Sequence, residues 1–162
     1  MITHFESSIQ QKTPGNAINF SEFKTEMAPR LPSQNMIYAV KIHGTFPSVT
    51  VRAIPAQEKP YSVLTDVVKQ QKIFTYTNIS GTFVGFYMPA IFRDLNIMGY
   101  HFHFISDDHT RGSHILDFTI APGTTVQYDP KPDFTLALPA SGPFASTDFS
   151  ADEDSGVEAI GE

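Results

Sequence analysis

Alternation of apolar and polar residues is the strongest signal in this sequence, and it recurs in several short segments. Residues 36–54 alternate on both sides of Gly44, which predicts two strands joined by a hairpin turn at that glycine. Residues 73–79 and 82–88 predict two further strands, with a turn at residues 80–81. This spacing of short strands and turns is typical of an antiparallel sheet.

A helical period is clearest in residues 62–72, where apolar side chains recur on one face and lysines lie near the end. Residues 1–34 are polar and broken by prolines, and they predict an arm or loop with one edge strand near residues 18–23. Residues 123–134 are rich in proline and predict a turn-rich return. A last short strand is expected at residues 135–138.

These elements predict one α+β unit, mainly antiparallel β-sheet with one main helix. A chain of 162 residues is long enough to bury one hydrophobic core. We expect an N-terminal arm over residues 1–34, a β-rich domain over residues 35–138 and an acidic tail over residues 139–162. The tail carries few large apolar side chains, which is typical of a flexible segment unless a site holds it in place.

Charge and composition narrow the classes of partner. The net charge is −6, with 11 basic and 17 acidic residues and no basic cluster, which argues against nucleic acid and anionic membranes as partners. The absence of cysteine excludes disulfides and thiolate metal ligands. Neither a signal peptide nor an apolar run long enough to span a bilayer is present. We therefore expect a soluble protein that acts in the cytoplasm.

Candidate chemistry is concentrated in residues 99–118, which contain four of the six histidines. Residues 100–105 and 115–120 alternate on either side of a polar centre and predict a β-hairpin with a longer loop. His101 and His103 are two residues apart, so a strand places both on one face.

The register of this hairpin decides where the third histidine lies. If Ser106 pairs with Ser113, His114 faces Ile105 and becomes the diagonal neighbour of His103, at about 7–8 Å between Cα atoms. Three imidazoles on one face would form a metal site on a central hairpin, with open coordination positions. Zinc suits such a site first, then iron, copper or nickel. The alternative is that these are ordinary surface or core histidines, but a His-x-His pair with a third histidine in register favours the metal site.

The two halves of this hairpin also carry a family resemblance. Gly-Tyr-His-Phe-His-Phe-Ile-Ser-Asp-Asp at residues 99–108, followed by Gly-Ser-His-Ile-Leu-Asp-Phe at residues 112–118, resembles the signature of the α-acetolactate decarboxylases. Arg-Ala-Ile-Pro at residues 52–55 and Gly-Thr-Phe-Val-Gly-Phe at residues 81–86 follow the order and spacing of that family. The resemblance implies Zn2+-dependent decarboxylation of 2-acetolactate, a 2-hydroxy-3-oxo acid, to acetoin and carbon dioxide.

The resemblance also implies roles for individual residues. The metal ligands would be His101, His103 and His114. Arg52 would face the substrate, since a bidentate guanidinium suits a carboxylate. The C-terminal tail would bring Glu162, or alternatively Glu158, to the metal as the proton donor. The acids of the hairpin, Asp107, Asp108 and Asp117, would orient histidines or shape the turn.

Two features depart from the family pattern. Tyr87 stands where the family usually carries an arginine. The family also has an N-terminal half that ends in a functional glutamate, and Met1 resembles the position directly after it. Either this sequence begins after that glutamate, or another chain supplies it, or the protein has lost this part of its site.

Alternative functions follow from these departures and from the histidine spacing. A non-catalytic metal-binding relative would retain metal without turnover. A cupin-like metalloenzyme is suggested by His101-x-His103 with Asp107, although His114 follows too soon for the second cupin motif. A homodimer is among the open oligomeric states. His43 and His109 are expected to be dispensable, because neither register nor spacing directs them to the site.

Overall fold

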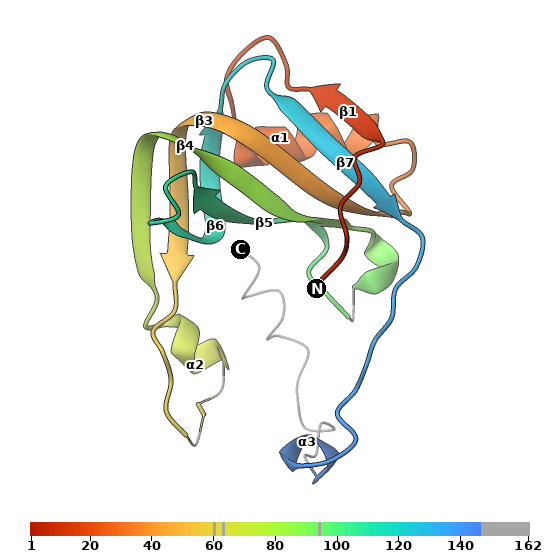
Figure 1. Cartoon of the computed structure of the whole chain (residues 1–162), viewed down its shortest axis with the longest axis vertical. Helices are drawn as coiled ribbons and strands as arrows, with labels where there is room; N and C mark the ends of the chain where they lie inside the picture. Colours follow the sequence, from red (N-terminus) through yellow and green to blue (C-terminus); the bar gives the residue numbers. More distant parts are fainter. Residues whose placement is uncertain (60, 63, 94, 147–162) are drawn as a thin grey trace.

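The computed structural model describes residues 1–59, 61–62, 64–93 and 95–146 (Figure 1). Its strands are β1 (Ile9–Lys12), β2 (Ile18–Asn19), β3 (Ile37–Ala53), β4 (Lys72–Met88), β5 (Gly99–Ser106), β6 (Gly112–Ile120) and β7 (Thr125–Lys131). Its helices are α1 (Phe20–Met27), α2 (Leu64–Val68) and α3 (Pro143–Ser146), with 3-10 turns η1 (Ala28–Arg30) and η2 (Ala90–Phe92). No helix in this part of the chain is long and apolar enough to cross a membrane.

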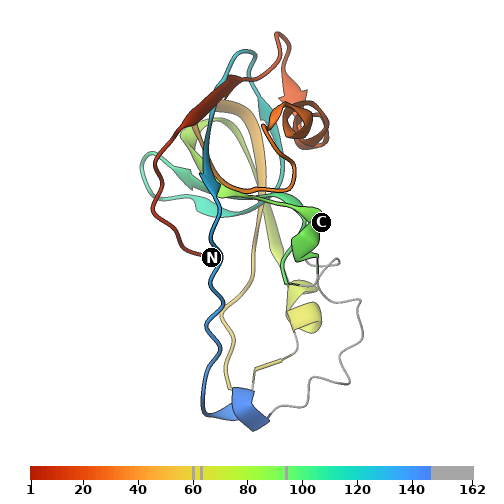
Figure 2. The ribbon, with the colours of Figure 1, turned by 90° about the vertical axis from the view of Figure 1, so that its right-hand side faces the viewer.

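The strands form one antiparallel sheet in the order β1-β7-β3-β4-β5-β6-β2. Strand β3 also pairs with β6, so β3, β4, β5 and β6 form a closed ring of pairings. Figure 2 shows these strands curling around a common interior. The prediction of an α+β fold built mainly on antiparallel sheet is confirmed.

The predictions of turns at Gly44 and at residues 80–81 are wrong. Strands β3 and β4 each run unbroken for 17 residues, and Gly44 pairs with Gly81 within their ladder. A Cβ atom at Gly81 would overlap the carbonyl oxygen of Ile105 and the ring of Phe104. This glycine therefore permits a close approach of β5 to β4, which is the other common use of glycine within a strand.

Strand β3 changes both its partner and its buried face along its length. Its first part pairs with β7 and its last part with β6. Pro47 lies opposite Asn78, which has a φ of 48°, between the paired residues on either side. The fully buried positions shift there from even numbers, ending at Phe46, to odd numbers, beginning at Val49. As a result, the side chain of Arg52 lies on the face opposite to the interior.

The longest helix that the structure describes lies within residues 1–34, where the sequence predicted an arm. The side chain of Asn19 accepts a hydrogen bond from the backbone N–H of Glu22 at 2.9 Å, and the Glu22 carboxylate accepts one from the N–H of Asn19 at 2.8 Å. This reciprocal pair is a capping box, and it starts α1. The helix expected over residues 62–72 is limited to α2. Strand β7 replaces the expected loop, and the last strand expected at residues 135–138 does not form.

The core is rich in aromatic side chains and lies on one face of β5. Tyr100, Phe102 and Phe104 are all at most 5% exposed. Phe23 of α1 is fully buried and packs edge-on against Tyr100, Phe102 and Phe118. Because successive strand residues point to opposite faces, His101 and His103 lie on the outer face of the same strand. The core thus fixes the strand that carries the two histidines.

Replacement of Gly81 by alanine is expected to destabilise the protein by about 1–3 kcal/mol, because the added methyl group overpacks the contact with β5. Gly44→Ala provides the matched control, since its nearest neighbour would be a Thr124 methyl carbon at an ordinary 3.9 Å. Urea unfolding of both variants measures the difference. Equal destabilisation would contradict the proposed close approach.

Candidate metal centre

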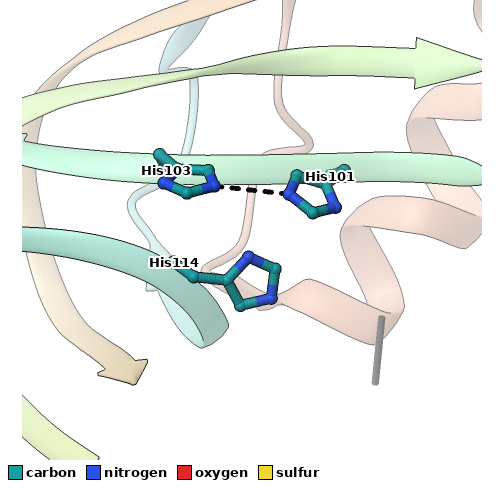
Figure 3. A group of neighbouring side chains, drawn as sticks. All are labelled: His101, His103 and His114. Carbon is teal, nitrogen blue, oxygen red and sulfur yellow. Dashed lines mark hydrogen bonds between the residues drawn. The ribbon is translucent and has the colours of Figure 1, made fainter. Parts of the chain in front are cut away.

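Three histidines from two adjacent strands form a compact cluster. His101 and His103 extend from β5, and His114 extends from β6 toward them (Figure 3). One ring nitrogen from each residue lies within 4.8 Å of the others. The Nε2 atoms of His101 and His103 are 3.3 Å apart. A single metal ion could therefore contact all three imidazoles.

The pairing between β5 and β6 differs by two residues from the one expected. His103 pairs directly with His114, and Phe104 pairs with Ser113. The loop is closed by the hydrogen bond from the Ser106 N–H to the Arg111 carbonyl at 2.8 Å. A shift of one residue would have reversed the face of every side chain, whereas a shift of two preserves it. The predicted diagonal contact is thus a direct one, and the histidines share a face.

Asp108 shapes the loop of this hairpin. Its Oδ1 accepts hydrogen bonds from the Ser106 hydroxyl at 2.6 Å and from the Thr110 N–H and hydroxyl at 3.0 and 2.8 Å. These bonds, led by the one from Ser106, lower the pKa of Asp108 to about 2. His109 lies exposed in the same loop with a φ of 58°. Of the two roles expected for the hairpin acids, Asp108 takes the turn-shaping one.

A bulge in β6 brings Arg52 into the same row as the histidines. Thr50 pairs with Asp117 but Val51 pairs with Ile115, so Leu116 is an extra residue in β6. Beyond this bulge Arg52 pairs with His114. Because paired residues on antiparallel strands point to the same side, the guanidinium and the imidazole project from one face. Bulges commonly redirect side chains beside active sites.

Arg52 is held by several contacts. It is only 5% exposed, and its Nη1 donates to the Gln71 Oε1 at 3.5 Å. The Ser113 hydroxyl donates to the Arg52 backbone carbonyl, which ties this part of β3 to the strand that carries His114. Burial lowers the pKa of Arg52 below its usual value. Only a very large shift would neutralise an arginine, so the group is a cation at neutral pH.

The electrostatic surroundings keep the histidines neutral. Burial, followed by the other imidazoles and the Arg52 guanidinium, lowers the pKa of His101 to about 4 and that of His114 to about 3. Burial, followed by Arg52, also lowers the pKa of His103. A metal requires the deprotonated ring nitrogen, so this donor set is ready to bind at neutral pH. Three neutral imidazoles within reach of one another fit a zinc ion.

A cleft of about 700 Å³ lies beside the cluster and includes His101 and His103 in its wall. Val84, Phe86 and Met88 of β4 supply much of its apolar lining. The N-terminal segment, residues 1–5, forms the other wall. The Asp129 carboxylate holds the end of this segment by accepting the Glu6 N–H at 2.7 Å. A small organic molecule in this cleft would lie next to the histidines.

The remaining residues considered from the sequence lie elsewhere. His43 is 3.1 Å from the Thr82 hydroxyl and 3.7 Å from Asp107, away from the cluster. Tyr87 is 8% exposed and packs against Tyr100 in the core, on the face opposite to the histidines. Glu162 and Glu158 lie outside the described residues.

The sequence did not predict the contact that Asp117 makes with α1 or the bulge at Leu116. The Asp117 carboxylate accepts the N–H of Phe20 at 3.3 Å, so it supports the start of α1. The bulge at Leu116 had one signal in the sequence, because the apolar residues Ile115 and Leu116 are adjacent within a segment that otherwise alternates. A strict alternation from Phe118 would have buried Leu116 in place of Ile115.

Comparison with known proteins gives a consistent result. Residues 1–151 match the family model described as alpha-acetolactate decarboxylase. The alpha-acetolactate decarboxylase of Methanosarcina mazei is 37% identical over 98% of this chain and 54% of its own length. That of Bacillus licheniformis is 39% identical over 93% of this chain and 58% of its own length. The chain thus spans about half the length of the curated relatives it matches.

A solved structure supports the same relationship. The crystal structure of the Bacillus subtilis alpha-acetolactate decarboxylase superposes with a TM-score of 0.83 at 34% identity. The match covers 90% of this chain and 62% of that one.

Replacement of His103 by alanine is expected to abolish binding of a divalent transition metal, because it removes the central member of the cluster. His109→Ala is the matched control, since it removes a histidine of the same hairpin that lies in the exposed loop. Metal content by plasma mass spectrometry should stay near one ion per chain in the control. Equal losses in both variants would mean that the ligands are wrongly assigned.

Proposed function

The chain belongs to the alpha-acetolactate decarboxylase family, and on this premise we propose that it catalyses the zinc-dependent decarboxylation of 2-acetolactate to acetoin and carbon dioxide. The observation that carries the proposal is the cross-strand row in which Arg52 pairs with His114 and His114 pairs with His103, beside an apolar cleft. Neutral metal ligands and a cation on one face suit a substrate with two oxygen donors and a carboxylate.

The proposed zinc ligands are the three clustered imidazoles, His101, His103 and His114. When bound, zinc supplies Lewis-acid stabilisation of negative charge that develops on a substrate oxygen. The protein contributes a rigid donor set, because both strands that carry the histidines are anchored by aromatic side chains on their other face.

Arg52 is proposed to act on the carboxylate. In the reaction the bond between the carboxylate carbon and C2 breaks, carbon dioxide departs, and the electron pair delocalises onto the ketone oxygen as an enediolate. The Arg52 guanidinium can orient the carboxylate through two parallel hydrogen bonds before the bond breaks. Because it is buried, its charge also acts strongly on the anion that forms.

A proton must then reach C2 of the enediolate to form acetoin. The resemblance assigns this role to Glu162, with Glu158 as the alternative. Both lie outside the described residues, so this role is a proposal from the family pattern. Delivery from one face of the enediolate would give acetoin of a single configuration.

A measurement of acetoin formation would distinguish the proposed decarboxylase from the alternative functions. The family match favours the decarboxylase over a cupin-like metalloenzyme. A non-catalytic metal-binding relative is the other alternative, because Tyr87 stands where the family usually carries an arginine. The homodimer and the cytoplasmic location stay predictions.

Zinc-loaded protein is expected to form acetoin from 2-acetolactate, and Arg52→Lys is expected to lower kcat/KM by about 10²–10³-fold, as for loss of one preorganised donor. The lysine retains the charge but cannot form the two parallel hydrogen bonds. Acetoin formation measured colorimetrically, alongside zinc content, checks both expectations.

Arg111→Lys is the control for this experiment, because it makes the same change in the loop of the hairpin. Metal-free protein should be inactive. Zinc retention without any turnover in the unmodified protein would favour the non-catalytic relative. Equal effects of the two arginine substitutions would argue against a specific role for Arg52.

Replacement of Glu162 by glutamine is expected to lower kcat by about 10²–10⁴-fold, the usual contribution of general acid catalysis, while zinc content stays unchanged. Glu158→Gln is the matched comparison. Deletion of the tail from Asp152 onward should have the effect of the more damaging of the two substitutions. An unchanged rate in all three variants would show that the proton comes from another source.

A further inference from the structure

We propose that Lys41 is a substrate-steering residue, whose ammonium group attracts the carboxylate of an anionic substrate into the cleft beside the histidines. This inference rests on the proposed decarboxylase function, because it assigns a role in capturing that substrate. Lys41 is not one of the proposed zinc ligands, and its role differs from the one proposed for Arg52.

The first support is the register of the sheet. Lys41 of β3 pairs with Val84 of β4, and Val84 pairs with His103 of β5. The same row continues through His114 to Arg52. Directly paired residues project from the same face, so Lys41 and Arg52 are cations at the two ends of one row, with the histidines between them.

The second support is the cleft itself. Lys41 lines it together with His101 and His103. With adjacent strands about 4.8 Å apart, its Cα lies roughly 10 Å from that of His103. Lys41 thus stands near enough to act on a carboxylate entering the site, and far enough away to stay outside the metal ligands.

The third support is the state of the ammonium group. Within the part of the chain that the structure describes, the Lys41 side chain forms no hydrogen bond and no ion pair. The acid that lies diagonally from it on β7, Asp129, is already engaged by Lys131 at 2.6 Å and by the Glu6 N–H at 2.7 Å. The charge of Lys41 is therefore available to a ligand in the cleft.

The net charge of the chain is a reason why a local cation would help an anionic substrate to bind. At a net charge of −6 the protein as a whole repels an anionic substrate. The exposed Lys41, at the wall of a largely apolar cleft, counters this repulsion locally, because low-dielectric walls focus its field. The main effect should be on capture of the substrate, with little effect on the chemical step.

The test compares Lys41→Gln with the unmodified protein, both loaded with zinc, at several salt concentrations. We expect Lys41→Gln to lower kcat/KM for 2-acetolactate by about 3–10-fold at low ionic strength, with kcat and zinc content nearly unchanged. The difference should shrink as salt is added, because salt screens the charge. Lys41→Arg should restore the rate.

Lys24→Gln is the matched control, since it removes one positive charge from α1, which packs on the opposite face of β5. If both lysine substitutions lower kcat/KM equally, only the net charge matters and the proposal fails. A fall in kcat that salt does not alter would also overturn it, because that result would indicate a structural or chemical role.

A binding measurement separates this proposal from the proposed function. Calorimetry on the zinc-loaded protein can use an unreactive analogue, 2-acetolactate with its ketone reduced to an alcohol, and neutral acetoin. Lys41→Gln should weaken binding of the carboxylate analogue by a similar factor and leave that of acetoin unchanged. This result would support the role of Lys41 even in a protein without turnover, whereas equal binding of the analogue to both proteins would overturn it.

Discussion

The candidate site depends on the register between β3 and β6. Arg52 faces the histidines only because Leu116 is an extra residue in β6, which moves the pairing from Thr50–Asp117 to Val51–Ile115. Without this bulge Arg52 would pair with Ile115, and either the arginine or the isoleucine would lie on the wrong face. The hydrogen bond from Ser113 to the Arg52 carbonyl then holds the two strands together directly beside the site. A single inserted residue thus places a cation and the candidate metal-binding cluster on one face.

The aromatic core provides the rigidity that such a surface needs. In β5 the buried residues Tyr100, Phe102 and Phe104 alternate with the histidines, so each imidazole lies between two anchored neighbours. Fully burying one such side chain contributes about 1.5–3 kcal/mol. Helix α1 covers this side of the strand through Phe23, and its capping box fixes where the helix begins. Within residues 1–34, helix α1 therefore contributes to the site indirectly, whereas residues 1–5 line the cleft itself.

Alternation allowed the sequence to predict β5 and the shared face of the histidines, because the period of a strand survives a shift of two residues in register. The sequence could not predict the exact pairing, since the bonds that close the loop involve Ser106, Asp108 and Arg111 in three dimensions. Glycine was the main source of error in the fold. Gly44 and Gly81 follow the local pattern of turns, but their pairing deep within a long ladder is decided by neighbouring strands. The capping box of Asn19 and Glu22 was a local signal that could have revealed α1.

The positive charge of Arg52 has two opposing effects on metal binding by the histidines. Its guanidinium helps to lower the pKa of all three histidines, which keeps them neutral but also places a positive charge near any divalent metal that they bind. Both a bound metal and Arg52 would be stabilised by an anion between them, and the carboxylate of the proposed substrate, with its neighbouring oxygens, would supply that charge. The proposed steering role of Lys41 places a second cation at the other end of the row, beside the cleft. An anionic ligand would thus relieve the repulsion between the Arg52 guanidinium and a metal held by the histidines.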